Sequence, residues 1–256
     1  MELMQPELQK IIETDWIFRT ILGRVPPSHG ALSPSTGCVS VFVGDPDSLL
    51  VARSLMFQAA LSVCDTGGNA VYFTPTRWVS LPVKMCEIPY PDLSSLRRLK
   101  MVYRTNPRDT VRALLEDIKK TSGTMLLFVC IEDLTAMCRA VARKTDWSVV
   151  KSMASVLCSL EEVVLSARLT GGSLRIVGWM DKSMELQCKE VFQRFGVQTS
   201  HLTATTDTVR AQLFGPTGKD TPVHEISLSV TPEGLKYEKL PRVDVKDTSG
   251  DNGIDS

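Results

Sequence analysis

The chain has 256 residues, which at a typical ~150 residues per domain corresponds to one or two domains. Apolar residues make up 43% of it, enough to build a packed core, so a wholly disordered chain is excluded. Lys and Arg together number 29, as do Asp and Glu, so the formal net charge is zero. This balance excludes a globally basic nucleic-acid-binding protein, but it is compatible with a local basic patch.

The seven cysteines are odd in number, include no Cys-x-x-Cys motif, and in several cases lie inside apolar runs. We therefore expect reduced, buried cysteines in a cytosolic or nuclear protein rather than a disulfide or zinc framework. The first residues (MELMQ) carry no secretory signal, and the longest apolar run, residues 125–131, is far shorter than a ~20-residue membrane span. These features predict a soluble intracellular protein without membrane contact.

Residues 1–37 and 241–256 differ in character from the rest of the chain. Apolar residues recur at helical spacing between positions 8 and 17, which predicts an amphipathic helix over 5–21. Prolines and glycines then continue up to position 37 and indicate a linker. Residues 241–256 are polar and acidic, and we expect them to be disordered. The organised domain therefore spans residues 38–240.

The domain begins with the pattern of a β-α-β unit. Residues 38–43 (CVSVFV) are typical of a buried strand, and the turn GDPDS follows, in which Asp47 or Ser48 can cap a helix. Apolar positions from 49 to 63 follow helical spacing, glycines end the helix, and residues 70–74 (AVYFT) form a second strand. Such a unit implies a parallel sheet with a right-handed crossover.

The same alternation continues along the chain. We expect strands at 99–103, 125–131 and 173–179, and helices at 107–120, 146–169 and 183–195. Three further strands, at 208–214, 224–230 and 235–239, end the domain, and a turn at 231–234 joins the last two. The predicted fold class is α/β, with a mostly parallel sheet, helices on both faces and an antiparallel edge hairpin.

The loop after the first strand lies where a nucleotide-binding α/β protein has its phosphate-binding loop. That loop needs Gly-x-x-x-x-Gly-Lys-Ser/Thr, because backbone N–H groups wrap the phosphates, the lysine neutralises charge and the hydroxyl holds Mg²⁺. In register with Gly44, this chain has Leu49, Leu50 and Val51 in place of the second glycine, the lysine and the hydroxyl. Asp45 and Asp47 add negative charge. The sequence therefore predicts a scaffold loop without bound ATP or magnesium.

No catalytic set is apparent in the sequence. The strand at 125–131 would end in a magnesium-binding aspartate in an active nucleotide hydrolase, but Glu132 and Asp133 come one or two positions late. They are remnants of a catalytic site or, in the favoured interpretation, the polar start of a loop. None of the three histidines is near a cysteine in the sequence; a Cys–His pair assembled in three dimensions stays open, although structural cysteines are favoured. We assign no catalytic residue and no metal ligand.

Basic residues cluster between positions 97 and 112, where the only acid is Asp109. The candidate contacts with single-stranded DNA are Arg97, Arg98, Lys100, Tyr103, Arg104 and Arg108. A local basic stripe can engage a phosphate backbone, and the tyrosine can stack on a base. An ordinary solvated surface explains the same pattern about equally well.

Phe57 and Ala60 form an F-x-x-A motif on the predicted helix at 49–63. A large and a small side chain on one helical face are suited to anchoring in the pocket of a partner protein. Core packing of the helix gives the same spacing, and the periodicity alone favours that interpretation.

Together these segments resemble the RecA-like recombinase family, and within it the small recombinase paralogues that serve as SWIM-zinc-finger-associated subunits of Shu complexes. The resemblance covers about residues 38–240. It rests on the order and spacing of VFVG at 41–44, FQAA at 57–60, VYFT at 71–74, LRRLKMVY at 96–103, the strand at 125–131 and the final hairpin with Glu233 and Gly234.

This resemblance implies a RecA-like P-loop NTPase core and a nuclear protein of homologous recombination repair. Such paralogues are similar to ATPases stimulated by single-stranded DNA. They pair with a SWIM-type zinc-finger protein and support recombinase filaments, and their F-x-x-A element binds recombinase, which would place Phe57 and Ala60 at that contact. Because residues 49–51 depart from the family's Walker A motif, we expect assembly and DNA binding with little or no ATPase activity.

Two other classes of protein stay open. The RecA-like accessory subunits of Elongator, which form a ring and help tRNA modification, also lack the Walker residues and fit the degenerate loop equally well. The match at 96–103 argues against them. The third class is an unrelated metabolic α/β enzyme, which would need a cleft with titratable residues of shifted pKa. The lack of a recognisable set of catalytic polar residues in the sequence argues against this class.

Overall fold

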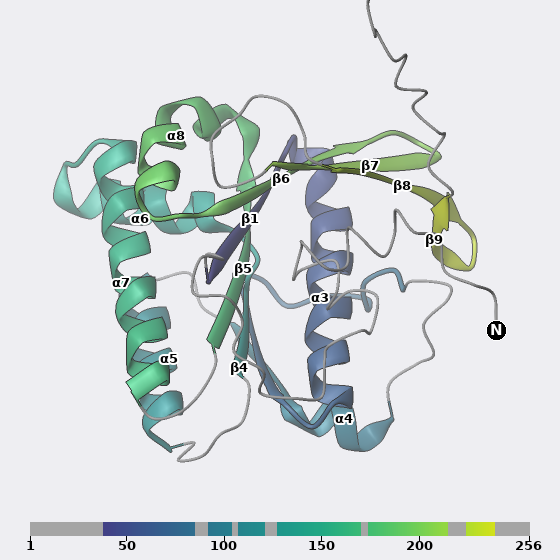
Figure 1. Cartoon of the computed structure of the whole chain (residues 1–256), viewed down its shortest axis with the longest axis horizontal. Coiled ribbons are helices and arrows are strands. Elements are labelled where there is room, and N and C mark those ends of the chain that lie inside the picture. The colour runs from purple at the N-terminus through teal and green to yellow at the C-terminus, as the bar shows by residue number, and fades with distance from the viewer. Residues whose placement is uncertain are drawn as a thin grey trace, which may run out of the picture.

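The computed structural model describes residues 38–84, 92–103, 107–120, 127–169, 174–214 and 224–238 (Figure 1). The predicted helix at 5–21, the linker that follows it, the tail at 241–256 and Arg104 lie outside these residues. The described residues therefore belong to the domain expected at 38–240 and cover most of it.

A nine-stranded sheet organises the described residues, in the strand order β3-β2-β4-β5-β1-β6-β7-β8-β9. The strands are β1 (Val39–Gly44), β2 (Asn69–Thr74), β3 (Leu99–Tyr103), β4 (Leu127–Ile131), β5 (Leu174–Asp181), β6 (Gln198–Ala204), β7 (Thr208–Phe214), β8 (His224–Thr231) and β9 (Gly234–Glu238). Strands β1 to β6 pair in parallel, and β7, β8 and β9 add to β6 in antiparallel fashion. The predicted α/β class, with a mostly parallel sheet and an antiparallel edge hairpin, is confirmed.

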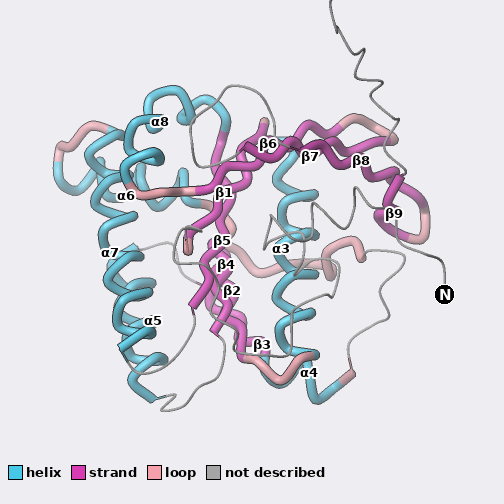
Figure 2. The backbone as a smooth tube through the Cα atoms, viewed as in Figure 1, coloured by secondary structure: helices cyan, strands magenta, loops and turns pink. Residues whose placement is uncertain are grey.

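Helices cover both faces of the sheet, with α3 on one side of the parallel strands and α5, α6, α7 and α8 on the other (Figures 1 and 2). The helices are α3 (Leu49–Asp65), α4 (Leu93–Arg98), α5 (Pro107–Lys120), α6 (Leu134–Thr145), α7 (Val149–Leu169) and α8 (Glu185–Arg194). Two 3₁₀ turns, η1 (Pro46–Ser48) and η2 (Lys182–Met184), precede α3 and α8. This arrangement buries the central strands on both faces.

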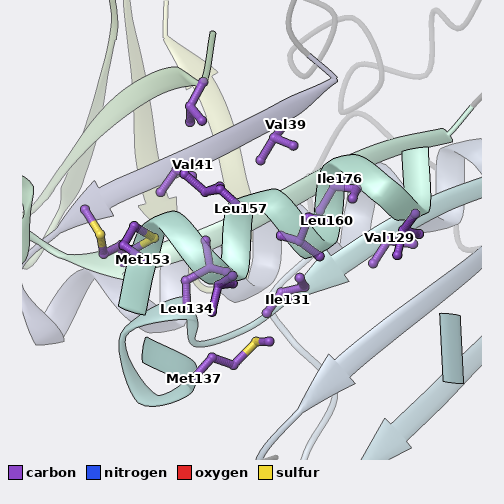
Figure 3. Packing of buried hydrophobic residues seen from close by; sticks show 14 of the residues in the cluster. Val39, Val41, Val129, Ile131, Leu134, Met137, Met153, Leu157, Leu160 and Ile176 are labelled. Carbon is purple, nitrogen blue, oxygen red and sulfur yellow. The ribbon is translucent and has the colours of Figure 1, made fainter. Parts of the chain in front are cut away.

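Strand β1 illustrates why the central strands are apolar without interruption. Its odd-numbered valines face α7, where Val39 and Val41 lie near Leu157 and Leu160 (Figure 3), while Phe42 points to the opposite face and packs with α3. Because successive side chains of a strand alternate between faces, a strand covered on both sides needs apolar residues at nearly every position.

Helix α3 is buried on more than one side. Its residues Ala52 and Leu55 share a core cluster with Phe42 of the parallel sheet and with Ala211 and Ile226 of β7 and β8. Together with η1, the stretch Pro46–Asp65 is long and apolar enough to cross a membrane by length and composition, and 67% of its most apolar window is buried inside the protein. Contact with both parts of the sheet explains why this helix is apolar around most of its circumference.

Three elements differ from the sequence-based expectations. Strand β6 was missed because its sequence, QTSHLTA, is mostly polar, although Ser200 and Leu202 are buried on the α3 side. Helix α6 was also missed, and the helix expected from position 146 begins at Val149, because Asp146 adopts a left-handed conformation (φ 56°) that ends α6. The short helix α4 was not expected either.

A close contact between β5 and α6 generates the first prediction. A Cβ atom on Gly178 would lie 2.8 Å from Cγ of Leu134, which is itself fully buried and has no space to move. Gly178→Ala should therefore destabilise the protein by about 1–3 kcal/mol, measured by urea unfolding. In combination with Leu134→Ala, the loss should be smaller than the sum of the two single losses, because the shorter side chain makes room. Additive losses would contradict this packing.

Candidate functional site

The carboxyl ends of β4, β5 and β1 meet at one edge of the sheet, because these neighbouring strands are parallel. The chain leaves β1 for α3 on one face and leaves β5 for α8 on the other. Ligands of open α/β sheets bind where connections diverge in this way. The segments after these strands, at 45–48, 132–133 and 182–184, therefore make up the candidate site.

The loop after β1 is closed by its own hydrogen bonds. The carbonyl oxygen of Asp45 accepts from the backbone N–H of Ser48 at 2.8 Å and from its hydroxyl at 2.7 Å, and the N–H of Leu49 donates to Pro46. The indole of Trp179 on β5 donates to the Ser48 hydroxyl at 3.3 Å. The backbone N–H groups of Ser48 and Leu49 are therefore already bonded within the loop.

Gly44 serves this closed loop rather than a ligand. A Cβ atom at this position would collide with the Ser48 side chain and would lie 2.7 Å from the carbonyl oxygen of Leu202. Ser48 is 1% exposed, so its side chain fills the space beside the glycine. The glycine is required by packing, which is a different reason from the one that places glycine in a phosphate-binding loop.

The residues at the lysine and hydroxyl positions of a phosphate-binding loop do not face a ligand. All three residues lie in the first turn of α3. Leu50 is 65% exposed, whereas Leu49 and Val51 pack against the core. Asp45 and Asp47 are exposed at the mouth of the loop, where they would repel an anion. The loop thus places no cation at the position of the lysine, and two of its N–H groups are already bonded internally.

Glu132 is the most deeply buried carboxylate of the site, with 1% of its surface exposed. It forms an ion pair with Arg53 of α3, and its Oε2 accepts a hydrogen bond of 2.9 Å from the indole of Trp78. The guanidinium of Arg53 also lies over the Trp78 ring, 5.5 Å from its centroid. A buried charge needs such compensation, so Glu132 is committed to internal contacts rather than to a metal ion.

Asp133 is likewise engaged. Its side chain accepts a hydrogen bond of 2.8 Å from the N–H of Ala136 and caps α6, and burial raises the pKa of this carboxyl above its usual range. The neighbouring Thr135 hydroxyl accepts from the N–H of Asp181, which links the ends of β4 and β5. Within the described residues, no group of three or more His, Cys, Asp and Glu side chains is arranged to hold a metal ion.

Trp78 belongs to an aromatic cluster on the outer side of α3. Its ring packs edge-to-face on Tyr72 at 4.9 Å and on Phe57 at 5.3 Å. Sequence reasoning missed Trp78 and Arg53, although an arginine inside the apolar run LLVARSLMFQAA was a usable signal that a buried acid lies opposite.

The F-x-x-A motif is part of this core. Ala60 has no exposed surface, and Phe57 is half-buried between Tyr72 and Trp78. In this conformation the motif cannot contact a partner through Ala60. The structure therefore favours core packing, and a recombinase contact through Phe57 and Ala60 would require α3 to be uncovered.

The basic stripe divides into parts with different roles. Arg98 donates a hydrogen bond of 3.0 Å to the carbonyl oxygen of Cys64 and ties α4 to the end of α3. Arg97 and Lys100 are exposed at the start of the edge strand β3. Tyr103, 46% exposed, lies at the other end of β3 with Arg77 5.6 Å from its ring centroid. Arg108 begins α5, where its side chain is not among those described.

Side-chain alternation separates these groups further. On β3, Met101 packs with the α3 cluster and Val102 with the cluster on the opposite face. Lys100 therefore projects to the α5 side and Tyr103 to the α3 side. The basic residues line an edge of the sheet and do not form a single flat surface.

The cysteines and histidines of the described residues show no nucleophilic pair. Burial raises the pKa of Cys64 to about 11 and of Cys138 to about 12, so both thiols stay protonated and unreactive at neutral pH. His201 pairs with Glu185 rather than with a cysteine. The cysteines at these positions are part of the core, as the sequence predicts.

The ion pair generates the second prediction. Arg53→Met should leave the Glu132 carboxylate buried without a cation and cost about 3 kcal/mol of unfolding free energy, measured by urea denaturation. Adding Glu132→Gln should restore most of this loss, because no charge then remains buried. As a matched control, Arg112→Met removes an exposed pair with Glu116 and should change stability by less than about 0.5 kcal/mol. Equal effects of Arg53→Met and Arg112→Met would contradict the assignment.

Comparison with known proteins adds no relative to these observations. No protein-family model matches the chain, and no curated protein matches it significantly.

Proposed function

We propose that this protein is a RecA-like subunit without ATPase activity, which acts by assembly in a Shu-type complex of homologous recombination. The observation that carries the proposal is the closed loop after β1. A strand, loop and helix at the centre of the sheet follow the order expected of a nucleotide-binding α/β protein, while Ser48 fills the space beside Gly44 and internal hydrogen bonds hold the loop. The fold fits a NTPase relative, and the chemistry of the loop fits a subunit whose role is structural.

Binding of single-stranded DNA is the second part of the proposal. The edge at β3 presents Arg97 and Lys100 at one end and the Arg77–Tyr103 pair at the other. Phosphate groups would contact the cations, and a base would stack on the exposed tyrosine. Nuclear localisation follows from this role as an expectation.

The protein partners in this proposal are a SWIM-type zinc-finger protein and a recombinase. The experiment that tests it is affinity purification of the tagged chain from its own cells with mass spectrometry of the proteins that accompany it. We expect both partners to be recovered. Recovery of Elongator subunits instead would assign the chain to tRNA modification, which the closed loop fits equally well. Recovery of neither set would limit the likeness to the fold.

DNA binding has its own prediction. The double variant Arg97→Glu/Lys100→Glu should weaken binding to a fluorescent oligothymidine and lower the slope of log affinity against log salt by about 0.7 per lost phosphate contact. Arg98 is left unchanged because it holds the Cys64 carbonyl. Affinity of the unmodified protein should be the same with and without ATP and Mg²⁺.

The matched control reverses two exposed charges away from the β3 edge, in η2 and α8, with Lys182→Glu/Arg194→Glu. This control should bind the oligonucleotide nearly as well as the unmodified protein. An unchanged affinity of the Arg97/Lys100 variant at low salt would rule out the β3 edge as the DNA-binding surface.

A further inference from the structure

Residues 75–84, which we call the strap, leave β2 and cross α3 to reach the far edge of the sheet (Figure 2). The strap is fixed at two points. Near its start, Trp78 donates to Glu132 and packs on Phe57 of α3. At its end, the carbonyl oxygen of Lys84 accepts a hydrogen bond of 2.8 Å from the N–H of Leu235 on β9.

The contact with β9 requires a glycine. Gly234 has φ of 141°, and a Cβ atom there would overlap the Lys84 carbonyl group. The anchor at Trp78 includes the buried ion pair, whose charges cost desolvation free energy and so contribute position more than stability. Both ends of the strap are thus held by specific contacts.

Between these anchors the strap displays apolar side chains to solvent. Val79 is fully exposed, Leu81 is 72% exposed and Val83 is 50% exposed, whereas Pro82 and Lys84 are half-buried. A row of exposed apolar residues on a fixed segment is typical of an interaction site rather than of scattered surface residues.

The strap itself carries positive charge and no acid. No acidic residue occurs between positions 66 and 84, while Arg77 and Lys84 flank the row. The 49–64 part of α3 also lacks acids, and Glu132 beneath the strap is neutralised by Arg53. The surface is therefore complementary to a segment that carries both apolar side chains and carboxylates.

We propose that the strap is the docking surface for a segment of another protein that bears aliphatic side chains interspersed with Asp or Glu. Val79, Leu81 and Val83 stand at alternate positions, which suits an extended segment whose alternate side chains point the same way. A nucleic acid is disfavoured because its phosphates would meet an apolar row. The proposal goes beyond the assembly and DNA-binding roles above and does not depend on DNA binding.

Photo-crosslinking in the protein's own cells tests this surface. The full-length chain would carry p-benzoylphenylalanine at position 81 or, as a matched control, at position 186, because Leu186 is an equally exposed leucine (84%) on α8 across the sheet. We expect a protein adduct at 81 and none at 186, with the crosslinked peptide rich in aliphatic and acidic residues. Adducts at both positions, no adduct, an adduct with lipid or with a second copy of the chain, or a crosslinked peptide without carboxylates would overturn the proposal.

A pair of point variants gives an independent readout. Leu81→Asp should reduce recovery of the crosslinked partner about tenfold, because it places a like charge against the partner's carboxylates. Leu186→Asp should leave recovery unchanged. Both side chains are exposed, so the thermal unfolding midpoint should be the same for both variants, and oligothymidine binding should persist in each. Unchanged recovery of the partner with Leu81→Asp would overturn the docking surface.

Discussion

The position of helix α3 is the constraint on which the other features depend. This helix must connect β1 to β2 across two intervening strands while β7 and β8 extend the sheet over it. Such a helix has little surface left for solvent, so its sequence is apolar around most of its circumference. Arg53 is the one charged residue in the middle of the helix. It is tolerated because it forms an ion pair with Glu132 and lies over the ring of Trp78.

The same constraint helps to explain why this edge of the sheet is unsuited to a nucleotide. A phosphate-binding loop requires open N–H groups and a cation at the start of the following helix. Here η1 tightens the entry to α3, Ser48 occupies the space next to Gly44, and the partly buried Arg53, one turn into the helix, neutralises the buried carboxylate of Glu132. Residues 49–51 accordingly follow an internally bonded loop, and placing glycine, lysine and threonine at these positions would not by itself open it.

The sequence was informative where burial alone determines structure. Apolar runs such as CVSVFV and LFVCI predicted central strands, and the glycine and proline positions predicted the turns between them. Strand β6 was not predicted because its sequence is mostly polar. Pairing with β1 and β7 stabilises it, which is a tertiary effect. The Arg53–Glu132 ion pair was not predicted for a related reason. The two residues are 79 positions apart, so their pairing is apparent only once the fold has brought the end of β4 beside α3. The basic cluster was found, but its division between two faces depends on the register of β3.

The hydrogen bond between Lys84 and Leu235 joins positions roughly 150 residues apart, so it closes a very long loop and carries a large entropic cost that only a nearly folded chain can meet. It also connects the strand next to one edge of the sheet with the strand at the opposite edge. If β9 separates from β8, the hydrogen bond to Lys84 is lost and one end of the strap is released. If Trp78 leaves its contacts, the same hydrogen bond to β9 is weakened. We therefore expect local opening at the antiparallel edge to be coupled to opening beside α3.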